Sequence, residues 1–217
     1  MRTLGTNPAT TEGLGLFRIR LIVGLGNPGP RYVRTRHNVG ANFVCALAER
    51  FGIRLHEESR FKGRVGRGAV AGADDIRLLV PSTFMNLSGE SVGAMARFYK
   101  FEPEEILVAY DEMAFEPGVL RLRSGGGDNG HNGIKSVTEG LGNDREFHRL
   151  RIGVGHPGSP ELVTAFLTSH TMPEADRLLV ESSLLIEKQV LSDMLAGEMQ
   201  KAMNELHAPL LDEEEEG

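Results

Sequence analysis

The sequence has 217 residues, a length typical of a single domain that encloses a hydrophobic core. Its 40% hydrophobic and 25% charged residues are typical of globular proteins and argue against a membrane-spanning chain. A single cysteine, Cys45, excludes a disulfide framework within the chain, and the N-terminus lacks the apolar core of a signal peptide. These features predict a protein of the reducing cytoplasm.

The formal net charge of −6 is unevenly distributed along the chain. Residues 17–151 carry 20 basic against 16 acidic side chains, whereas residues 152–217 carry 3 against 13. The first two thirds of the chain can therefore face a polyanion although the whole protein is acidic. We expect a flexible N-terminal extension at 1–16, one domain over 17–207 and a disordered acidic tail at 208–217.

Strands and helices are predicted to alternate in the first half of the chain. They are, in order, a strand at 19–23, a helix at 38–51 capped by Asn38, strands at 64–71 and 75–81 joined by a turn at 73–75, and a helix capped by Ser88. Apolar residues recur every four positions in the first helix, whereas the first strand is a short β-rich run that ends at Gly24.

The second half continues with strands at 106–110, 119–123 and 147–154. Residues 171–174 form a capping-box sequence that opens one long C-terminal helix, with Leu179, Ile186, Val190 and Met194 on one face. This alternation predicts a single α/β domain with a mixed, mostly parallel central sheet flanked by helices.

Gly24, Gly26 and Gly29 have the G-x-G-x-x-G spacing of a dinucleotide site and follow a predicted strand. However, Pro28 and Pro30 interrupt the approach to the next helix, which in such a site must begin at once. We expect instead that the glycines form a sharp turn at the carboxyl edge of the sheet, where α/β proteins place their sites.

His37 stands just before the predicted helix, whose positive end favours the neutral imidazole. Asp111 follows the apolar strand 106–110, where a carboxylate can orient that imidazole and stabilise its charged form. Taken alone, His37 would be interpreted first as a packing or capping residue, and it is Asp111 that favours the catalytic interpretation. Because we find no nucleophile-elbow sequence around a serine or cysteine, water is the expected nucleophile.

Three asparagines, Asn27, Asn86 and Asn132, stand at the ends of predicted elements. Neutral amides can hold a peptide carbonyl or a developing oxyanion, although each asparagine alone is also typical of a turn. His131, His148 and His156 show no metal-ligand spacing, so no metal site is expected.

Arginines alternate with apolar residues on two predicted strands. Arg121 and Arg123 share one face of the first, and Arg149 and Arg151 share one face of the second. Such pairs suit a phosphate, although solvated outer faces explain them equally well.

Together these residues resemble the bacterial-type peptidyl-tRNA hydrolase family. The matching stretches are Val23–Gly29, Tyr32, Thr35–Asn38, Pro81–Gly89, Asp111–Glu112, Gly125–Gly127, Gly130–Gly133 and Phe147–Pro157. They occur in one order across residues 19–206, which makes the resemblance far more specific than any single motif.

The resemblance implies hydrolysis of the ester between a peptide and tRNA, which recycles tRNA for translation and ribosome rescue. It implies that His37 is the base, that Asp111 is the carboxylate that orients it, and that Asn27 helps to exclude substrates with a free amino group. The residues implied to hold the 3′ end and the peptide are Tyr32, Phe84, Asn86 and Asn132. Arg123 and Arg151 are implied to bind the tRNA 5′ phosphate. We expect the Asn27 carbonyl oxygen to accept a hydrogen bond from the amide of a blocked substrate. No cofactor, membrane or obligatory protein partner is implied, and the family is usually monomeric.

The chain departs from the family pattern at Tyr110, at Met113–Phe115 and at Asp128–Asn129. The last two concern the rim of the expected cleft rather than its chemistry. Two other interpretations remain at this stage, namely a catalytically silent RNA-binding relative with the same fold and an unrelated dinucleotide-dependent oxidoreductase.

Overall fold

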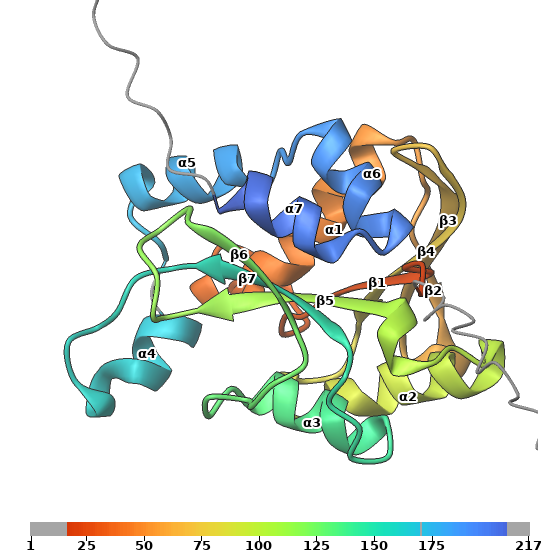
Figure 1. The fold of residues 1–217 in the computed structure, drawn as a ribbon. Helices are drawn as coiled ribbons and strands as arrows, with labels where there is room; N and C mark the ends of the chain where they lie inside the picture. The colour runs from red at the N-terminus through yellow and green to blue at the C-terminus, as the bar shows by residue number, and fades with distance from the viewer. Residues whose placement is uncertain (1–16, 170, 208–217) are drawn as a thin grey trace, which may run out of the picture.

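The structure, a computed structural model, describes residues 17–169 and 171–207. Its centre is a seven-stranded sheet with the order β2-β3-β4-β1-β5-β7-β6 (Figure 1). The strands are β1 (Leu21–Gly24), β2 (His56–Glu58), β3 (Gly63–Val70), β4 (Ala73–Pro81), β5 (Ile106–Glu112), β6 (Leu120–Ser124) and β7 (His148–Gly153). The predicted extension at 1–16 and the predicted tail at 208–217 lie outside the described residues.

The four central strands β4, β1, β5 and β7 are parallel, whereas β2, β3 and β6 pair antiparallel with their neighbours. The predicted α/β domain with a mixed sheet and a parallel core is confirmed. Because parallel strands end at the same edge, the residues at and just beyond Gly24, Glu112 and Gly153 lie together at one edge of the sheet.

Helices cover both faces of the sheet (Figure 1). They are α1 (Val39–Arg50), α5 (Glu174–Ser183), α6 (Lys188–Ala196) and α7 (Met199–Leu206) on one face, α2 (Ser88–Tyr99) and α3 (Asn132–Gly140) on the other, and the short α4 (Val163–Thr168) beyond the carboxyl ends of the strands. Side chains alternate between the two resulting cores, so that Ile22 packs in the first while Leu21 and Val23 pack in the second. No helix of the described chain is both long enough and apolar enough to cross a membrane.

The C-terminal region is three helices, so the prediction of one long helix is wrong. Gly197, with φ 85°, ends α6 in a left-handed conformation that glycine adopts without strain. Leu179 is 57% exposed and does not lie on an inner face. The predicted capping box is also absent, because Pro173 precedes α5 without a side-chain cap and Thr171 instead pairs with Thr35 in an isolated bridge.

The predicted hairpin is present, but its turn is two residues earlier than expected. Ala71 and Gly72 form the turn, both with positive φ, and residues 73–75 already belong to β4. Two positive-φ residues produce the turn geometry that matches the twist of paired strands, which explains the short connection.

Neither predicted helix cap is made by the expected side chain. Asn38 occupies the position before α1, but its side chain does not cap the helix. Leu87 precedes α2, and Ser88 is already inside that helix with its hydroxyl buried. Short 3₁₀ turns, η2 (Arg36–Asn38) and η4 (Met85–Leu87), lead into the two helices instead.

Candidate active site

The start of α1 lies directly against the central strands. The Leu25 N–H donates to the Ala109 carbonyl over 3.0 Å, and the Ala41 N–H donates to the Leu25 carbonyl over 2.9 Å. A methyl group at Gly40 would overlap the Ala109 carbonyl oxygen, so only glycine permits this approach. The 3₁₀ turn η2 just before α1 is thereby held at the carboxyl end of β5.

The two neighbours of His37 are anchored on opposite sides. Arg36 is buried and donates to the Val154 carbonyl over 3.2 Å and to the Asp176 carboxylate over 3.1 Å, and its guanidinium lies over the ring of Phe166. Asn38 exchanges two hydrogen bonds of 2.9 Å with the backbone of Asn27. These contacts of Arg36 and Asn38 fix the backbone of His37 without using its ring nitrogens.

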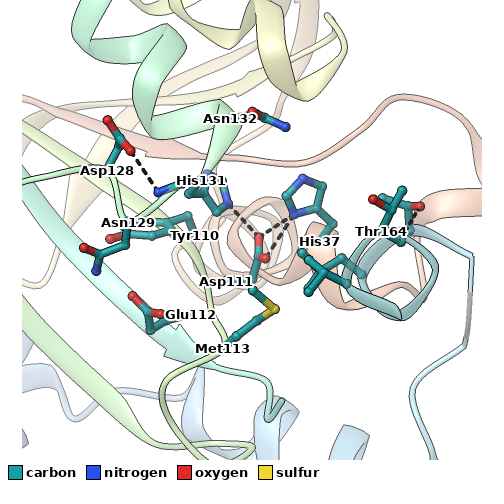
Figure 2. Close-up of a pocket in the computed structure, with 14 residues that line it drawn as sticks. His37, Tyr110, Asp111, Glu112, Met113, Asp128, Asn129, His131, Asn132 and Thr164 are labelled. Atoms are coloured by element: carbon teal, nitrogen blue, oxygen red, sulfur yellow. Dashed lines mark hydrogen bonds and ion pairs between the residues drawn. The ribbon is translucent and has the colours of Figure 1, made fainter. Parts of the chain in front are cut away.

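His37 and Asp111 form the pair that the sequence predicted. The His37 Nδ1 atom lies 2.9 Å from Oδ1 and 3.0 Å from Oδ2 of Asp111, and the two side chains are only 9% and 1% exposed. The carboxylate is an acceptor, so Nδ1 carries the proton and Nε2 keeps its lone pair. Figure 2 shows the second ring nitrogen of His37 facing away from Asp111, which is the geometry of a base held in one tautomer.

His131 is a third member of this group, and the sequence patterns did not predict it as a site residue. Its Nε2 lies 3.0 Å from Oδ1 of Asp111, while its Nδ1 accepts the N–H groups of Gly133 and Ile134 at the start of α3. An Nδ1 that accepts two hydrogen bonds is unprotonated, so Nε2–H donates to Asp111. The signal was its position just before a helix, where a side chain commonly caps the first N–H groups.

The charges of this group shift the pKa of both His37 and Asp111. Burial disfavours the charged form of His37, but the charge and hydrogen bonds of Asp111 outweigh burial and raise the pKa of His37 above its ordinary 6.5. Burial likewise acts to raise the pKa of Asp111, but the two imidazoles hold it well below its ordinary value. The carboxylate thus acts on the pKa of His37 in the opposite direction to burial and to the expected effect of the helix end, and whether the imidazole is neutral stays a prediction.

The ligand atoms of His37, Asp111 and His131 lie within 4.8 Å of one another, close enough to be considered as metal ligands. Their hydrogen bonds argue against that use. The His131 Nε2 must carry a proton because Nδ1 is occupied, and the His37 Nδ1 proton points at the carboxylate. Neither nitrogen has a lone pair directed at a shared ion.

A cleft of about 150 Å³ opens at the group. His37, Asp111 and Met113 lie on one side, residues 128–132 form a second wall and α4 contributes a third with Val163, Thr164, Leu167 and Thr168 (Figure 2). Both rim departures from the family pattern, Met113 and Asp128–Asn129, line this cleft. Tyr110 packs edge-on against His131 with ring centroids 4.9 Å apart.

Comparison with known proteins decides the family. The family model described as peptidyl-tRNA hydrolase matches residues 21–215. The chain is 48% identical over 190 residues to a peptidyl-tRNA hydrolase of Tolumonas auensis, covering 88% of this chain and 95% of the relative. It is 50% identical over 192 residues to that of Sodalis glossinidius, covering 88% and 98%. The crystal structure of peptidyl-tRNA hydrolase from Acinetobacter baumannii superposes with a TM-score of 0.84 at 43% identity, covering 90% and 98%.

The chain belongs to the peptidyl-tRNA hydrolase family. The resemblance recognised in the sequence is thus confirmed, and so is the assignment as an enzyme. The dinucleotide interpretation is wrong: β1 leads into 3₁₀ turns rather than directly into a helix, so the glycine turn lacks the helix N-terminus that holds a pyrophosphate.

Asn27 is one of the residues that the resemblance to this hydrolase family assigns to the site, and a hydrogen bond fixes its side chain. Its Oδ1 accepts the Met85 N–H over 2.9 Å. This bond orients the side chain so that its NH₂ can donate, while the second lone pair of the oxygen can still accept. The expected role of that oxygen toward a substrate amide stays a prediction.

Of the remaining residues predicted to contact substrate, only Asn132 lines the cleft beside the His37–Asp111 pair. Asn132 lines the cleft at the start of α3, whereas Asn86 follows Met85 in η4 and is exposed. A methyl group at Gly133 would overlap the Met85 sulfur, so η4 and the start of α3 are in contact. Two further aromatic residues, the half-buried Tyr32 and the 52% exposed Phe84, lie outside the residues that line the cleft.

The four arginines of β6 and β7 do share one face of the sheet, with Arg121 opposite Arg151 and Arg123 opposite Arg149. Their environments differ, however. Arg123 is exposed, and Arg151 donates from Nε and Nη2 to Glu112 over 3.1 and 2.9 Å. Arg149 is only 1% exposed, so the interpretation that it points outward beside Arg151 is wrong.

Proposed function

We propose that the chain hydrolyses the ester between the carboxyl group of a peptide and the terminal ribose of tRNA, with His37 as the general base. The observation that carries this proposal is the His37–Asp111 pair in the cleft, with Nδ1 committed to the carboxylate and Nε2 available to accept a proton. The names of the relatives support the substrate, and the geometry of the pair supports the mechanism.

In the first step, a water molecule gives one proton to Nε2 of His37 while its oxygen attacks the ester carbonyl carbon. His37 becomes an imidazolium, which the buried, ionised Asp111 stabilises over 2.9 Å. Collapse of the tetrahedral intermediate breaks the carbon–oxygen bond to the ribose. The leaving ribose oxygen takes the proton from His37, which regenerates the base.

The oxyanion of the intermediate needs hydrogen-bond donors that are already in place. We assign this role to the side-chain NH₂ groups of Asn27 and Asn132, since the bond from Met85 fixes the Asn27 side chain and Asn132 lines the cleft. Asn86, Tyr32 and Phe84 are assigned to the substrate's 3′ end and peptide, and Arg123 and Arg151 to the 5′ phosphate. The mechanism requires no metal or organic cofactor, no membrane and no protein partner, and we place it in the cytoplasm with the substrates of translation.

The test is release of acetylated amino acid from a blocked aminoacyl-tRNA, measured beside the unblocked aminoacyl-tRNA. Hydrolysis of the blocked substrate with little action on the unblocked one is the expected result. Binding of both without hydrolysis by either would instead support the catalytically silent RNA-binding relative.

A further inference from the structure

Arg149 is the largest of the fully buried side chains, at 1% exposure. Its charge is matched by backbone dipoles: Nη1 donates to the Gly127 carbonyl over 2.7 Å and Nη2 donates to the Gly126 carbonyl over 2.8 Å. The guanidinium also lies 4.6 Å from the centre of the Phe147 ring, and its Nε has no partner in the structure. A buried charge held in this way costs desolvation energy, which a merely space-filling residue would avoid.

The two carbonyls belong to a glycine-rich loop, residues 125–131, that joins β6 to α3. Four of its residues, Gly125, Gly126, Asn129 and Gly130, have positive φ angles of 62°, 107°, 48° and 78°. A loop rich in glycine has many alternative conformations and few side chains with which to select one. External contacts must therefore fix its path.

Arg123 supplies a second such contact from the neighbouring strand. It stands opposite Arg149 in the β6–β7 register, and a methyl group at Gly126 would overlap its guanidinium. The first half of the loop is therefore in contact with two guanidinium groups, one buried and one exposed.

The second half of the same loop forms a wall of the cleft. The His131 N–H donates to the Asp128 carbonyl over 2.8 Å, and the Gly130 N–H donates to the Asp128 carboxylate over 2.9 Å. His131 then donates to Asp111, and Asn132 follows at the cleft. A shift of Gly126 and Gly127 would be passed to these groups, because only three residues lie between Gly127 and His131.

We propose that Arg149 is a positioning residue for the hydrolysis: by holding the carbonyls of Gly126 and Gly127 it fixes the glycine-rich loop, and through the loop the positions of His131 and Asn132. This inference rests on the proposed function. Arg149 is thereby assigned to positioning the groups that carry out hydrolysis, whereas its neighbour Arg151 is assigned to RNA binding.

The test uses Arg149→Lys and Arg149→Gln, with Arg145→Gln as the matched control. A lysine keeps the charge but offers one donor nitrogen in place of the two that hold the carbonyls. Arg145 is an exposed arginine just before the same strand. Turnover is measured on a blocked aminoacyl ester of a short CCA oligonucleotide and on the full blocked aminoacyl-tRNA. Affinity for deacylated tRNA, melting temperature and amide hydrogen exchange are measured beside it.

For Arg149→Lys we expect turnover on both substrates to fall by roughly tenfold to a hundredfold, the scale of a small misplacement of catalytic groups. Deacylated tRNA should bind within about twofold of the parent, since no phosphate contact is removed. Amide hydrogen exchange should become faster in residues 125–131, while the amides of β1 and β5 should exchange as slowly as in the parent. Arg149→Gln should lie below the lysine variant in turnover, and Arg145→Gln should match the parent in turnover and loop exchange.

Faster loop exchange with full turnover would overturn the proposal, as would lost turnover with unchanged loop exchange. A loss confined to tRNA affinity would make Arg149 an RNA contact instead. Should the glutamine variant fail to fold, the lysine variant alone decides between these outcomes. If the parent protein itself does not hydrolyse the substrates, the proposed function fails, whereas the exchange data still report whether Arg149 holds the loop.

Discussion

His131 donates from Nε2 to the Oδ1 atom of Asp111 over 3.0 Å, and this is the same oxygen that lies 2.9 Å from Nδ1 of His37. One carboxylate oxygen thus accepts hydrogen bonds from two imidazoles, one from the residue that caps α3 and the other from η2, just before α1. Asp111 cannot rotate without losing at least one of these bonds. The relationship explains how a single carboxylate is held in the orientation that a catalytic base requires.

His37→Ala should reduce turnover on blocked aminoacyl-tRNA by on the order of a hundredfold or more, since a positioned general base is lost. His56→Ala, which changes an exposed histidine on β2, is the matched control and should retain parental turnover. Circular dichroism should show both variants folded. Near-parental turnover by folded His37→Ala would exclude His37 as the base.

Asp111→Asn should lower turnover and move the pH–rate profile. In the parent, His37 must be deprotonated to act, so activity rises with pH through a pKa that Asp111 has raised above 6.5. Without the carboxylate charge, burial alone acts on His37 and lowers its pKa, so the rising limb should shift to lower pH. Affinity for deacylated tRNA should change little. If the rising limb of the pH–rate profile stays at the same pH, Asp111 does not control the protonation of His37.

His131→Asn separates the two hydrogen-bonding roles of that residue. Asparagine is a good helix cap and can still accept the N–H groups at the start of α3, but it is too short to replace the bond to Asp111. Turnover should fall by about tenfold or more, since a hydrogen bond to a charged group contributes about 1.5–3 kcal/mol. The melting temperature should remain close to that of the parent, whereas His131→Ala should lower both quantities. If the asparagine variant has the turnover of the parent, His131 acts only as the cap of α3.

Sequence patterns were sufficient for the parts of the site that a regular element defines. The strand 106–110 and the glycine turn after β1 were predicted within a few residues, and both end at the edge where parallel strands place their active sites. His37 and Asp111 follow from that rule together with the resemblance.

The parts that were missed depend on contacts between distant segments. Residues 132–140 carry two glycines and only two apolar side chains, Ile134 and Val137, so α3 was not predicted, and the capping role of His131 was missed with it. Alternation placed Arg149 on the correct face of β7, but its burial depends on a loop that folds back over that face. The end of α6 did have a local signal in Gly197, which an analysis of helix ends alone would have detected.

Asn27→Asp should raise the rate on unblocked relative to blocked aminoacyl-tRNA. One oxygen of the new carboxylate can still accept the Met85 N–H, while the other replaces the NH₂ donor by an anion. That anion repels a carbonyl or oxyanion and attracts a free ammonium group, so the absolute rate on blocked substrate should fall at the same time. The measurement is the ratio of the two initial rates. A ratio equal to that of the parent would leave Asn27 as a turn residue that holds Met85.

Glu112→Gln should strengthen the binding of tRNA. In the parent, Arg151 donates two hydrogen bonds to Glu112, so part of its charge is neutralised before any phosphate arrives. Removing the carboxylate charge leaves the Arg151 guanidinium free to act on the 5′ phosphate, and the log–log dependence of affinity on salt should steepen. Arg123→Gln and Arg151→Gln should instead weaken binding and reduce that slope by about one. Turnover at saturating substrate should change little for Arg151→Gln, which does not contact the glycine-rich loop. Arg60→Gln, next to β2 at the opposite edge of the sheet, is the control for charge alone and should leave the slope unchanged.

The contradicting outcome is tRNA binding that is unchanged by Glu112→Gln and by Arg151→Gln but weakened by Arg123→Gln. Arg123 would then be the phosphate contact, and Arg151 a structural partner of Glu112.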